Sequence, residues 1–401
     1  MTFKSNYLSI TQNIMMGLIL LSCISIWLPI AFISVFMSLF MIVWLISGNY
    51  ADKFARIKQN PAAISATALV ALYAVGISYS STSSHAAFTF GAKYHKLLFI
   101  PMIASVLYDD KLRKLALNMF LGASLIILVL SYLNWFGVPM PEYHQGTQGN
   151  VIFKGRIAHN IFMSFAMYLM FQYAIKSDGY KKIAWLTLCL LVVFNILYLV
   201  NGRTGQITML ILAFWFCWET WQLKSLKYLV MLIVLSLGIH TIYPNFPSSR
   251  LVHTDIEMSK GASSSAGQRV EMYKNTLNLI SQHPIFGGGT GSLEHDYKLL
   301  AESEHLTMVK VTNPHNQYLL TMQELGIVGL IFLLWMWLMH WCASYRLSSH
   351  YEGYVLRGLV ITITIGSLFN SLILDASEGQ FYCVLVGVLL SGYLPKLNET
   401  T

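Results

Sequence analysis

The feature that most constrains what this chain can fold into is its series of long apolar runs. They fall at roughly 12–28, 30–47, 62–79, 93–108, 115–135, 157–175, 183–200, 205–221, 226–243, 317–342, 354–372 and 380–393. Most approach the ~20 residues that a helix needs to cross the hydrocarbon core of a bilayer, although the runs at 93–108 and 380–393 are short. Only 11% of the residues are charged, whereas a soluble domain has about 25%. We therefore expect an all-α polytopic membrane protein with about twelve transmembrane helices.

The excess of basic over acidic residues lies in the loops on one side of the expected membrane helices. The net charge is +8, and an even number of spans places both termini on the same side. The loops of that side carry 15 of the 26 basic residues but only 7 of the 18 acidic ones. Because loops rich in Lys and Arg stay inside, both termini should be cytoplasmic. The charge is thus a topology signal, so membrane lipid is an expected partner and nucleic acid is not.

The cysteines and the acidic residues of the sequence do not indicate a disulfide framework or a metal site. All five cysteines lie within apolar runs, which predicts neither a disulfide framework nor a zinc site. Glu294-His295-Asp296 is the one acidic cluster outside the membrane with a metal-like spacing. We weigh it as incidental, and we expect no metal and no cofactor.

One long polar segment divides the chain into three parts. Residues 1–243 are expected to hold nine transmembrane helices, 244–316 a loop domain on the outer side, and 317–401 three more helices with a short cytoplasmic tail. Within the loop domain, the serines at 263–265 are positioned to cap a helix that starts near Gly267.

This predicted helix is basic and amphipathic, and it carries Arg269. Its apolar stripe consists of Val270, Tyr273, Leu277 and Ile280. Pro284 and the glycines at 287–289 end the helix. We expect the helix to lie across the membrane surface, while the glycines either bring backbone close to a ligand or form a flexible turn.

Several basic side chains are predicted at the outer ends of spans. Arg203 follows Asn-Gly in a turn so tight that the next span begins at once. A guanidinium held there is costly unless it is paired or faces water, so we favour a functional role for Arg203. Arg156 and His159 are three residues apart and share a helix face, and Lys96 opens the fourth span. Interface anchoring is the default for these three, and a substrate contact is the alternative.

Asn313-Pro314 predicts a helix start, with Asn at the N-cap and Pro at the first helical position. His315 is then expected in the first turn, where the positive end of the helix dipole disfavours imidazolium. A neutral imidazole can accept a proton, and the same helix end offers N–H groups to an anion. One turn would thus hold a general base beside a phosphate site.

Arg203, Arg269 and His315 together favour one kind of chemistry. Two arginines can hold a diphosphate bidentately and stabilise it as a leaving group. A histidine can deprotonate an attacking hydroxyl. The set suits group transfer from a lipid-linked diphosphate outside the membrane, and the triple glycine lacks the pattern of a nucleotide P-loop.

Three segments carry a family resemblance. They read NGRTGQ at 201–206, GQRVEMYKNTLNLISQHPIFGGGTGS at 267–292 and NPHNQYLLTMQELGIVGLI at 313–331. In these motifs the chain resembles the O-antigen ligase and polymerase superfamily of bacterial envelope enzymes. The number and layout of the apolar runs agree with that family over the whole chain.

The resemblance implies a fold like that of the C-type glycosyltransferases, with the active site and the loop domain on the periplasmic face of the bacterial inner membrane. The implied donor is an undecaprenyl-diphosphate-linked glycan. In the ligase branch the acceptor is a sugar hydroxyl of lipid A–core, and the transfer is metal-independent and inverting. By motif position, Arg203 and Arg269 would bind the diphosphate, and His315 would act as the base or orient the acceptor. The wider substrate-binding set is Asn316, Arg156, His159, Lys96 and Gln206.

The leading interpretation is an O-antigen ligase, because 401 residues and one long outer loop fit that branch. A protein O-oligosaccharyltransferase usually has a longer C-terminal region. An O-antigen polymerase commonly has two substantial outer loops. A transporter of lipid-linked glycans is the alternative from another class, and it would show mid-membrane charges and repeated halves, which this sequence lacks.

Overall fold

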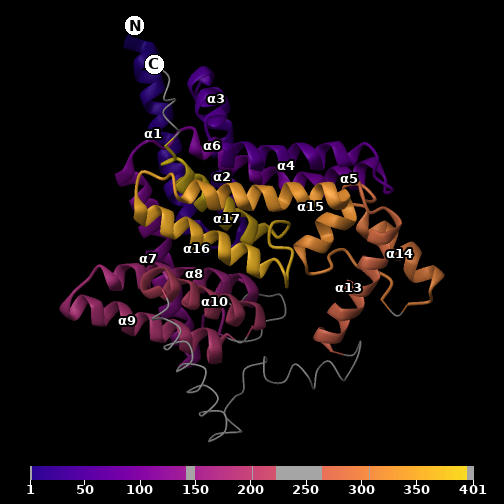
Figure 1. Ribbon diagram of the computed structural model, residues 1–401. Helices are drawn as coiled ribbons and strands as arrows, with labels where there is room; N and C mark the ends of the chain where they lie inside the picture. The colour runs from indigo at the N-terminus through magenta and orange to yellow at the C-terminus, as the bar shows by residue number, and fades with distance from the viewer. Residues whose placement is uncertain (1, 141–149, 201, 223–263, 307, 395–401) are drawn as a thin grey trace, which may run out of the picture. The chain divides into compact units, whose positions relative to one another are not determined.

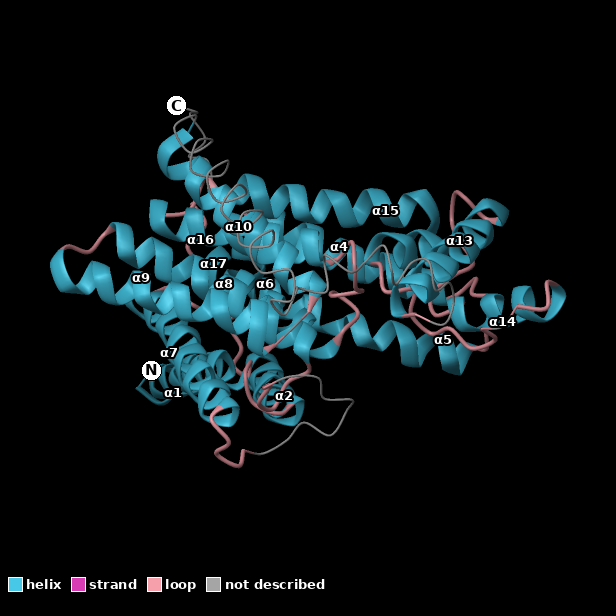
Figure 2. Ribbon diagram, turned by 90° about the horizontal axis from the view of Figure 1, so that it is seen from below, coloured by secondary structure: helices cyan, strands magenta, loops and turns pink. Residues whose placement is uncertain are grey.

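The computed structural model describes residues 2–140, 150–200, 202–222, 264–306 and 308–394. All regular elements in these ranges are helices, and no strand occurs in them (Figure 2). The chain forms two compact units, drawn together in Figure 1: a first unit of Met1–Phe120 with Arg269–Thr401, and a second unit of Leu121–Gln268. These unit boundaries reflect which residues pack together. The boundaries at 243 and 316 expected from the sequence describe membrane topology instead, and they stay a prediction.

The helices follow the apolar runs closely. In the first unit they are α1 (Thr2–Ser25), α2 (Ile30–Ile46), α3 (Tyr50–Lys58), α4 (Pro61–Ile77), α5 (Ser84–Gly91), the 3-10 helix η1 (Ala92–Leu98), α6 (Phe99–Ala104), α13 (Ser265–Gln282, from Arg269 on), α14 (Leu293–Ser303), α15 (Gln317–Ser344), α16 (His350–Gly366) and α17 (Ala376–Leu390). Helix α7 (Asp110–Trp135) passes into the second unit, which also holds α8 (Arg156–Ile175), α9 (Gly179–Phe194), the π-helix η2 (Asn195–Leu199) and α10 (Arg203–Trp221).

Length and apolar composition make the chain a membrane-spanning protein. Among the described residues, four helical stretches are long and apolar enough to cross a bilayer: Tyr7–Ser25, Asp110–Trp135, Gly179–Leu199 and Gln317–Ser344. The pair α2 and α3, bent by 114°, would make a fifth, and α4 and α17 are shorter apolar helices. Twelve spans therefore stay a prediction, and the run at 226–243 lies outside the described residues.

The run at 93–108 does not form one span. It is divided between η1 and the six-residue α6. Pro101 lacks the N–H that an uninterrupted α-helix would donate to the carbonyl of Leu97, which favours a change of helix type at this point.

Four helices of the first unit, α4, α15, α16 and α17, lie side by side (Figure 1). Asn60 starts α4, because its side-chain oxygen accepts hydrogen bonds from the N–H groups of Ala62 and Ala63 at 3.2 and 3.3 Å. Small buried residues on α4, including Ala66, let its backbone approach α15.

Helix α15 is broken at Gly326, whose φ is +63°. The N–H of Ile327 donates to the carbonyl of Pro284 at 2.9 Å, so the chain before α14 satisfies a backbone group freed by the break. A β-carbon on Gly326 would overlap the carbonyl of Ile285. The break thus requires glycine and separates a short part, 317–325, from a long part, 327–344.

The triple glycine packs against the same break. Gly288 donates its N–H to the carbonyl of Gln323 at 2.9 Å, and Gly289 donates to that of Glu324 at 2.8 Å. Gly289 has φ +92°, and a β-carbon there would overlap the backbone of Ser80. These glycines bring backbone close to other protein backbone, which is neither of the two roles expected from the sequence.

Helix α13 starts as expected but buries a different face. Ser264 caps it by accepting the N–H of Gly267 at 3.0 Å. Two residues of the predicted stripe, Val270 and Leu277, are 56% and 52% exposed, and the position of this stripe on a membrane surface stays a prediction. The buried face of α13 includes Met272, Asn275, Thr276 and Leu279. Polar residues are tolerated there because they are hydrogen-bonded, as Asn275 is to the hydroxyl of Tyr297 at 2.9 Å.

Candidate functional site

Helix α15 begins three residues later than Asn313 would place it. Its N-cap is Asn316, whose side-chain oxygen accepts the N–H groups of Tyr318 and Leu319 at 2.9 and 3.1 Å. The prediction that Asn313 is the N-cap, Pro314 the first helical residue and His315 part of the first turn is therefore wrong. Asparagine is a favoured N-cap residue, so either Asn313 or Asn316 could cap a helix. In the structure, Asn316 is the one that accepts the free N–H groups of the first turn.

His315 lies in a turn before the helix, with φ +56°. Its N–H donates to the side-chain oxygen of Asn313 at 2.8 Å. That oxygen also accepts the hydroxyl of Ser371 at 2.7 Å. Asn313 thus stabilises a left-handed conformation that is uncommon for a histidine.

Arg269 and Tyr273 approach this turn from α13. One guanidinium nitrogen of Arg269 donates to the side-chain oxygen of Asn370 at 3.4 Å. One helical turn later, the hydroxyl of Tyr273 contacts the carbonyls of His315 and Leu368, each at 3.2 Å. Because residues four apart share a helix face, α13 presents Arg269 and Tyr273 together to the His315 turn.

Burial lowers the pKa of His315, and the nearby charge of Arg269 lowers it further. The causes differ from the helix dipole invoked from the sequence, although the direction is the same. A ring with a pKa below the ordinary value is neutral near pH 7, so it can accept a proton.

The 367–375 loop between α16 and α17 completes this candidate site, although the sequence analysis assigned none of its residues a role there. Asn370 and Ser371 are buried in it, and Asn316 donates its side-chain NH₂ to Leu368 at 3.1 Å. Gln317, fully buried, accepts the N–H groups of Ile373 and Leu374 at 3.1 and 3.0 Å.

Lys96 supports the same loop from η1. It is only 3% exposed, and its ammonium donates to the carbonyls of Leu374 at 2.8 Å and Asp375 at 2.7 Å. Burial, together with the nearby Glu378, raises the pKa of the Asp375 carboxyl. The structure therefore places Lys96 beneath the 367–375 loop, where its geometry is that of a positioning residue.

Three of the other predicted residues are placed in the second unit by its packing. His159 is fully buried, and its Nε2 lies 2.9 Å from the side-chain oxygen of Asn195 in η2. Gln206 is also fully buried and donates to the carbonyl of Ile196 at 3.5 Å. Arg156 is the first residue of α8 and is half-buried.

Arg203 is the first residue of α10, with Gly202 at the N-cap. Helix η2 ends at Leu199, so the connection is short, although Asn201 of the expected turn lies outside the described residues. A β-carbon on Gly205 would overlap the side chain of Asn160 on α8. The NGRTGQ motif therefore brings α10 close to α8, while the pairing of Arg203 with Arg269 stays a prediction.

The acidic cluster of α14 is divided between separate interactions. Glu294 pairs with Lys310 at 3.4 Å on the surface. The two oxygens of Asp296 accept from the hydroxyl of Ser81 at 2.6 Å and from the amide of Gln323 at 2.9 Å. No group of three metal-binding side chains occurs in the described part of the chain.

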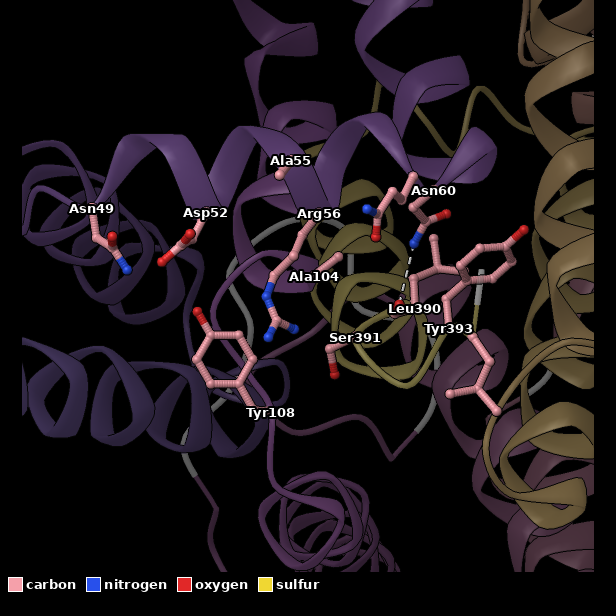
Figure 3. A pocket seen from close by; sticks show the side chains of 12 residues that line it. Asn49, Asp52, Ala55, Arg56, Asn60, Ala104, Tyr108, Leu390, Ser391 and Tyr393 are labelled. Atoms are coloured by element: carbon pink, nitrogen blue, oxygen red, sulfur yellow. Dashed lines mark hydrogen bonds between the residues drawn. The ribbon is translucent and has the colours of Figure 1, made fainter. Parts of the chain in front are cut away.

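A cavity of about 570 Å³ lies elsewhere in the first unit and contains none of the predicted site residues (Figure 3). The guanidinium of Arg56 stacks on Tyr108 at 3.9 Å, and Asn60 donates to the carbonyl of Leu390 at 3.2 Å. Arg56 and Asn60 are thus engaged with the fold, and we place no chemistry in this cavity.

Residues 188–334 match the family model for O-antigen ligase. The match supports the O-antigen ligase and polymerase superfamily for this part of the chain. The resemblance seen in the sequence is thereby confirmed, and the matched region contains Arg203, Arg269 and His315. The family implies an enzyme of the glycan ligase or polymerase type that uses lipid-linked glycans. No curated protein matches the chain.

Proposed function

We propose that this protein transfers a glycan from undecaprenyl diphosphate to a sugar hydroxyl of lipid A–core, on the periplasmic face of the inner membrane. The observation that carries the proposal is the pair of Arg269 and His315, held together by α13 and the 313–316 turn within the family-matched region. A neutral imidazole beside a guanidinium offers a proton acceptor next to an anion site.

In the proposed reaction, the acceptor oxygen forms a bond to the anomeric carbon of the donor as the bond from that carbon to the diphosphate breaks. The bonding electron pair leaves with undecaprenyl diphosphate, and the hydroxyl proton passes to His315. Arg269, with Arg203 as a second guanidinium, stabilises the charge of the leaving diphosphate. Direct displacement inverts the anomeric centre, and the scheme calls for no metal.

The other predicted residues act indirectly in this proposal. Asn316 uses its oxygen to cap α15 and its NH₂ to hold Leu368, so it positions the turn. Lys96 positions the 367–375 loop. Arg156, at the start of α8, stays a candidate for substrate contact, whereas the buried His159 and Gln206 would act by shaping the second unit.

The test is complementation of a strain that lacks the gene, with lipopolysaccharide and glycoproteins separated on gels. The wild-type chain should restore long-chain lipopolysaccharide, whereas His315→Ala and Arg269→Ala should not, although both proteins reach the membrane. His305→Ala is a matched control, because His305 is exposed and also has a positive φ, +53°. Lys274→Ala provides an exposed cation on the same helix as Arg269.

The phenotype of the strain without the gene separates the alternatives. Accumulated lipid-linked polymer with bare core supports the ligase. Core carrying single repeat units would instead assign a polymerase. Intact lipopolysaccharide with unglycosylated periplasmic proteins would assign a protein oligosaccharyltransferase, and normal activity in both site variants would refute the proposed site.

A further inference from the structure

A second cavity, of about 410 Å³, lies between α13, α14 and the short part of α15. Its polar lining comes from Gln282, His283, Asp296, Ser303 and Gln323. All of these residues belong to the first unit, as do Arg269 and His315. The mechanism proposed above uses none of them.

Gln323 is the residue that indicates a ligand. Its side chain is 2% exposed, and its NH₂ group donates to the hydroxyl of Ser292 at 3.0 Å and to the carboxylate of Asp296 at 2.9 Å. The carboxylate can only accept, so it fixes which end of the amide is nitrogen. The carbonyl oxygen Oε1 then has no donor among the described residues. Buried acceptors are rarely left unpaired, so a donor from outside the fold is expected here.

The lining suits a hydroxylated ligand. Gln323 and Asp296 contribute a side-chain amide and a carboxylate to the lining, while Leu279 and Leu299 add aliphatic surface. A sugar ring carries hydroxyl donors together with C–H faces, and so matches both kinds of lining. Asp296 is the sole acidic group of the lining, and no Lys or Arg lines the cavity, which disfavours a phosphate.

The cavity is near the proposed reaction site without being part of it. Gln323 lies six residues along α15 from Gln317, the first residue of the helix after the His315 turn, and at 1.5 Å per helical residue this is ~9 Å. Leu279 is ten residues along α13 from Arg269, or ~15 Å. A glycan that reacts at the His315 turn would therefore reach this cavity with a sugar other than the reacting one.

We propose that this cavity binds a sugar residue of a glycan substrate through the side chain of Gln323. The choice of a saccharide rests on the proposed function. The same sugar chemistry is available from the donor glycan and from the acceptor oligosaccharide, and the experiment tells them apart.

The experiment measures binding, without turnover, on the purified full-length protein in detergent. Two fluorescently labelled probes are used: the repeat-unit polysaccharide and the core oligosaccharide, each released by mild acid from the lipopolysaccharide of the source cells. Leu299→Trp and Ser303→Trp fill the cavity from the exposed side of α14. Lys298→Trp is the matched control, because Lys298 is an exposed neighbour that does not line the cavity.

We expect at least a tenfold weaker affinity for one probe in both filling variants, with the control equal to wild type. Weakening for the polysaccharide alone assigns the cavity to the donor, and weakening for the core alone assigns it to the acceptor. Equal affinity in all four proteins, or no binding of either probe to wild type, overturns the proposal. If binding depends on the cavity but the chain transfers no glycan in cells, the proposed function fails while the sugar site stands.

Discussion

Two turns contact α15, and they do so in opposite ways. The 287–291 turn meets the break at Gly326 with its backbone, and the N–H groups of Gly288 and Gly289 donate to carbonyls of α15. The 313–316 turn meets the start of the helix with asparagine side chains, which cap the helix and stabilise the left-handed His315. Both turns have the composition of a functional loop. One uses its polar groups to hold the fold, whereas the other leaves an imidazole beside a guanidinium.

The comparison shows that the hydrogen-bond partners of a turn distinguish a structural role from a functional one, whereas its composition does not. In the glycine turn, substitutions should damage the fold and reduce activity only through the amount of folded protein. In the histidine turn, substitutions should damage the reaction in a protein that stays folded.

The largest effect is expected for His315→Asn. Asparagine tolerates positive φ, so the turn should keep its shape while the proton acceptor is lost. General-base catalysis contributes about 10²–10⁴ in rate, so initial rates of transfer in vitro should fall by about that factor. The melting temperature should match wild type. A rate within a few-fold of wild type would show that the two turns are equally structural.

Gly289→Ala should produce the next largest effect, on stability. Its φ of +92° and the overlap with Ser80 predict a loss of about 3 kcal/mol or more, since strain of this kind costs about 1–3 kcal/mol before any overlap. Thermal unfolding in detergent, followed by tryptophan fluorescence, measures it. Gly17→Ala is the control, because no atom lies within 4 Å of its added β-carbon. Wild-type stability of Gly289→Ala would contradict the packing role of the glycine turn.

The electrostatic contact between Arg269 and His315 predicts a smaller, directional effect. Since Arg269 is a lesser cause of the lowered pKa than burial, Arg269→Gln should raise the pKa of His315 part of the way toward its ordinary value. The neutral base is present above its pKa and lost as pH falls through it, so the variant loses the neutral form at a higher pH than wild type. NMR of ¹⁵N-histidine-labelled protein measures this, with the signal assigned by its absence in His315→Asn. An unchanged or lower pKa of His315 in Arg269→Gln would contradict the electrostatic contact between the two side chains.

The smallest effect is expected for the helix cap. Asn316→Ala removes two hydrogen bonds to the first turn of α15 and should cost about 1 kcal/mol. The measurement is again thermal unfolding, and the expected decrease in melting temperature is a few degrees. Asn313→Ala, which leaves the N-cap intact, should instead reduce activity more than stability. The reverse pattern would restore Asn313 as the cap.

The sequence predicted those features that depend on local patterns. The apolar run at 62–79 became α4, that at 317–342 became α15, and a serine at 263–265 caps α13. It did not predict which asparagine caps α15, because Asn313 and Asn316 offer the same chemistry three residues apart. The choice depends on Ser371 and Leu368, which are more than fifty residues away in the chain.

The residues of the candidate site also fall into two groups, those that the sequence analysis identified and those that it missed. Arg269 and His315 stood out because charged and titratable side chains beside apolar runs are conspicuous. Asn370 and Gln317 did not, since each bonds to groups of the 367–375 loop or of α13 that no sequence spacing relates. The periodicity of α13 identified an apolar face without saying what covers it, and Val270 and Leu277 on that face are exposed.

The break at Gly326 also divides α15 into a part whose direction depends on the bilayer and a part whose direction depends on the protein. The long part of α15, residues 327–344, has a length of ~27 Å at 1.5 Å per residue, which is close to the ~30 Å thickness of the hydrocarbon core. Membrane thickness therefore acts on the tilt of this part. The nine residues before the break take their direction from the glycine turn and the 367–375 loop. We therefore expect the end of α15 next to the proposed site at His315 to keep its geometry in membranes of different thickness.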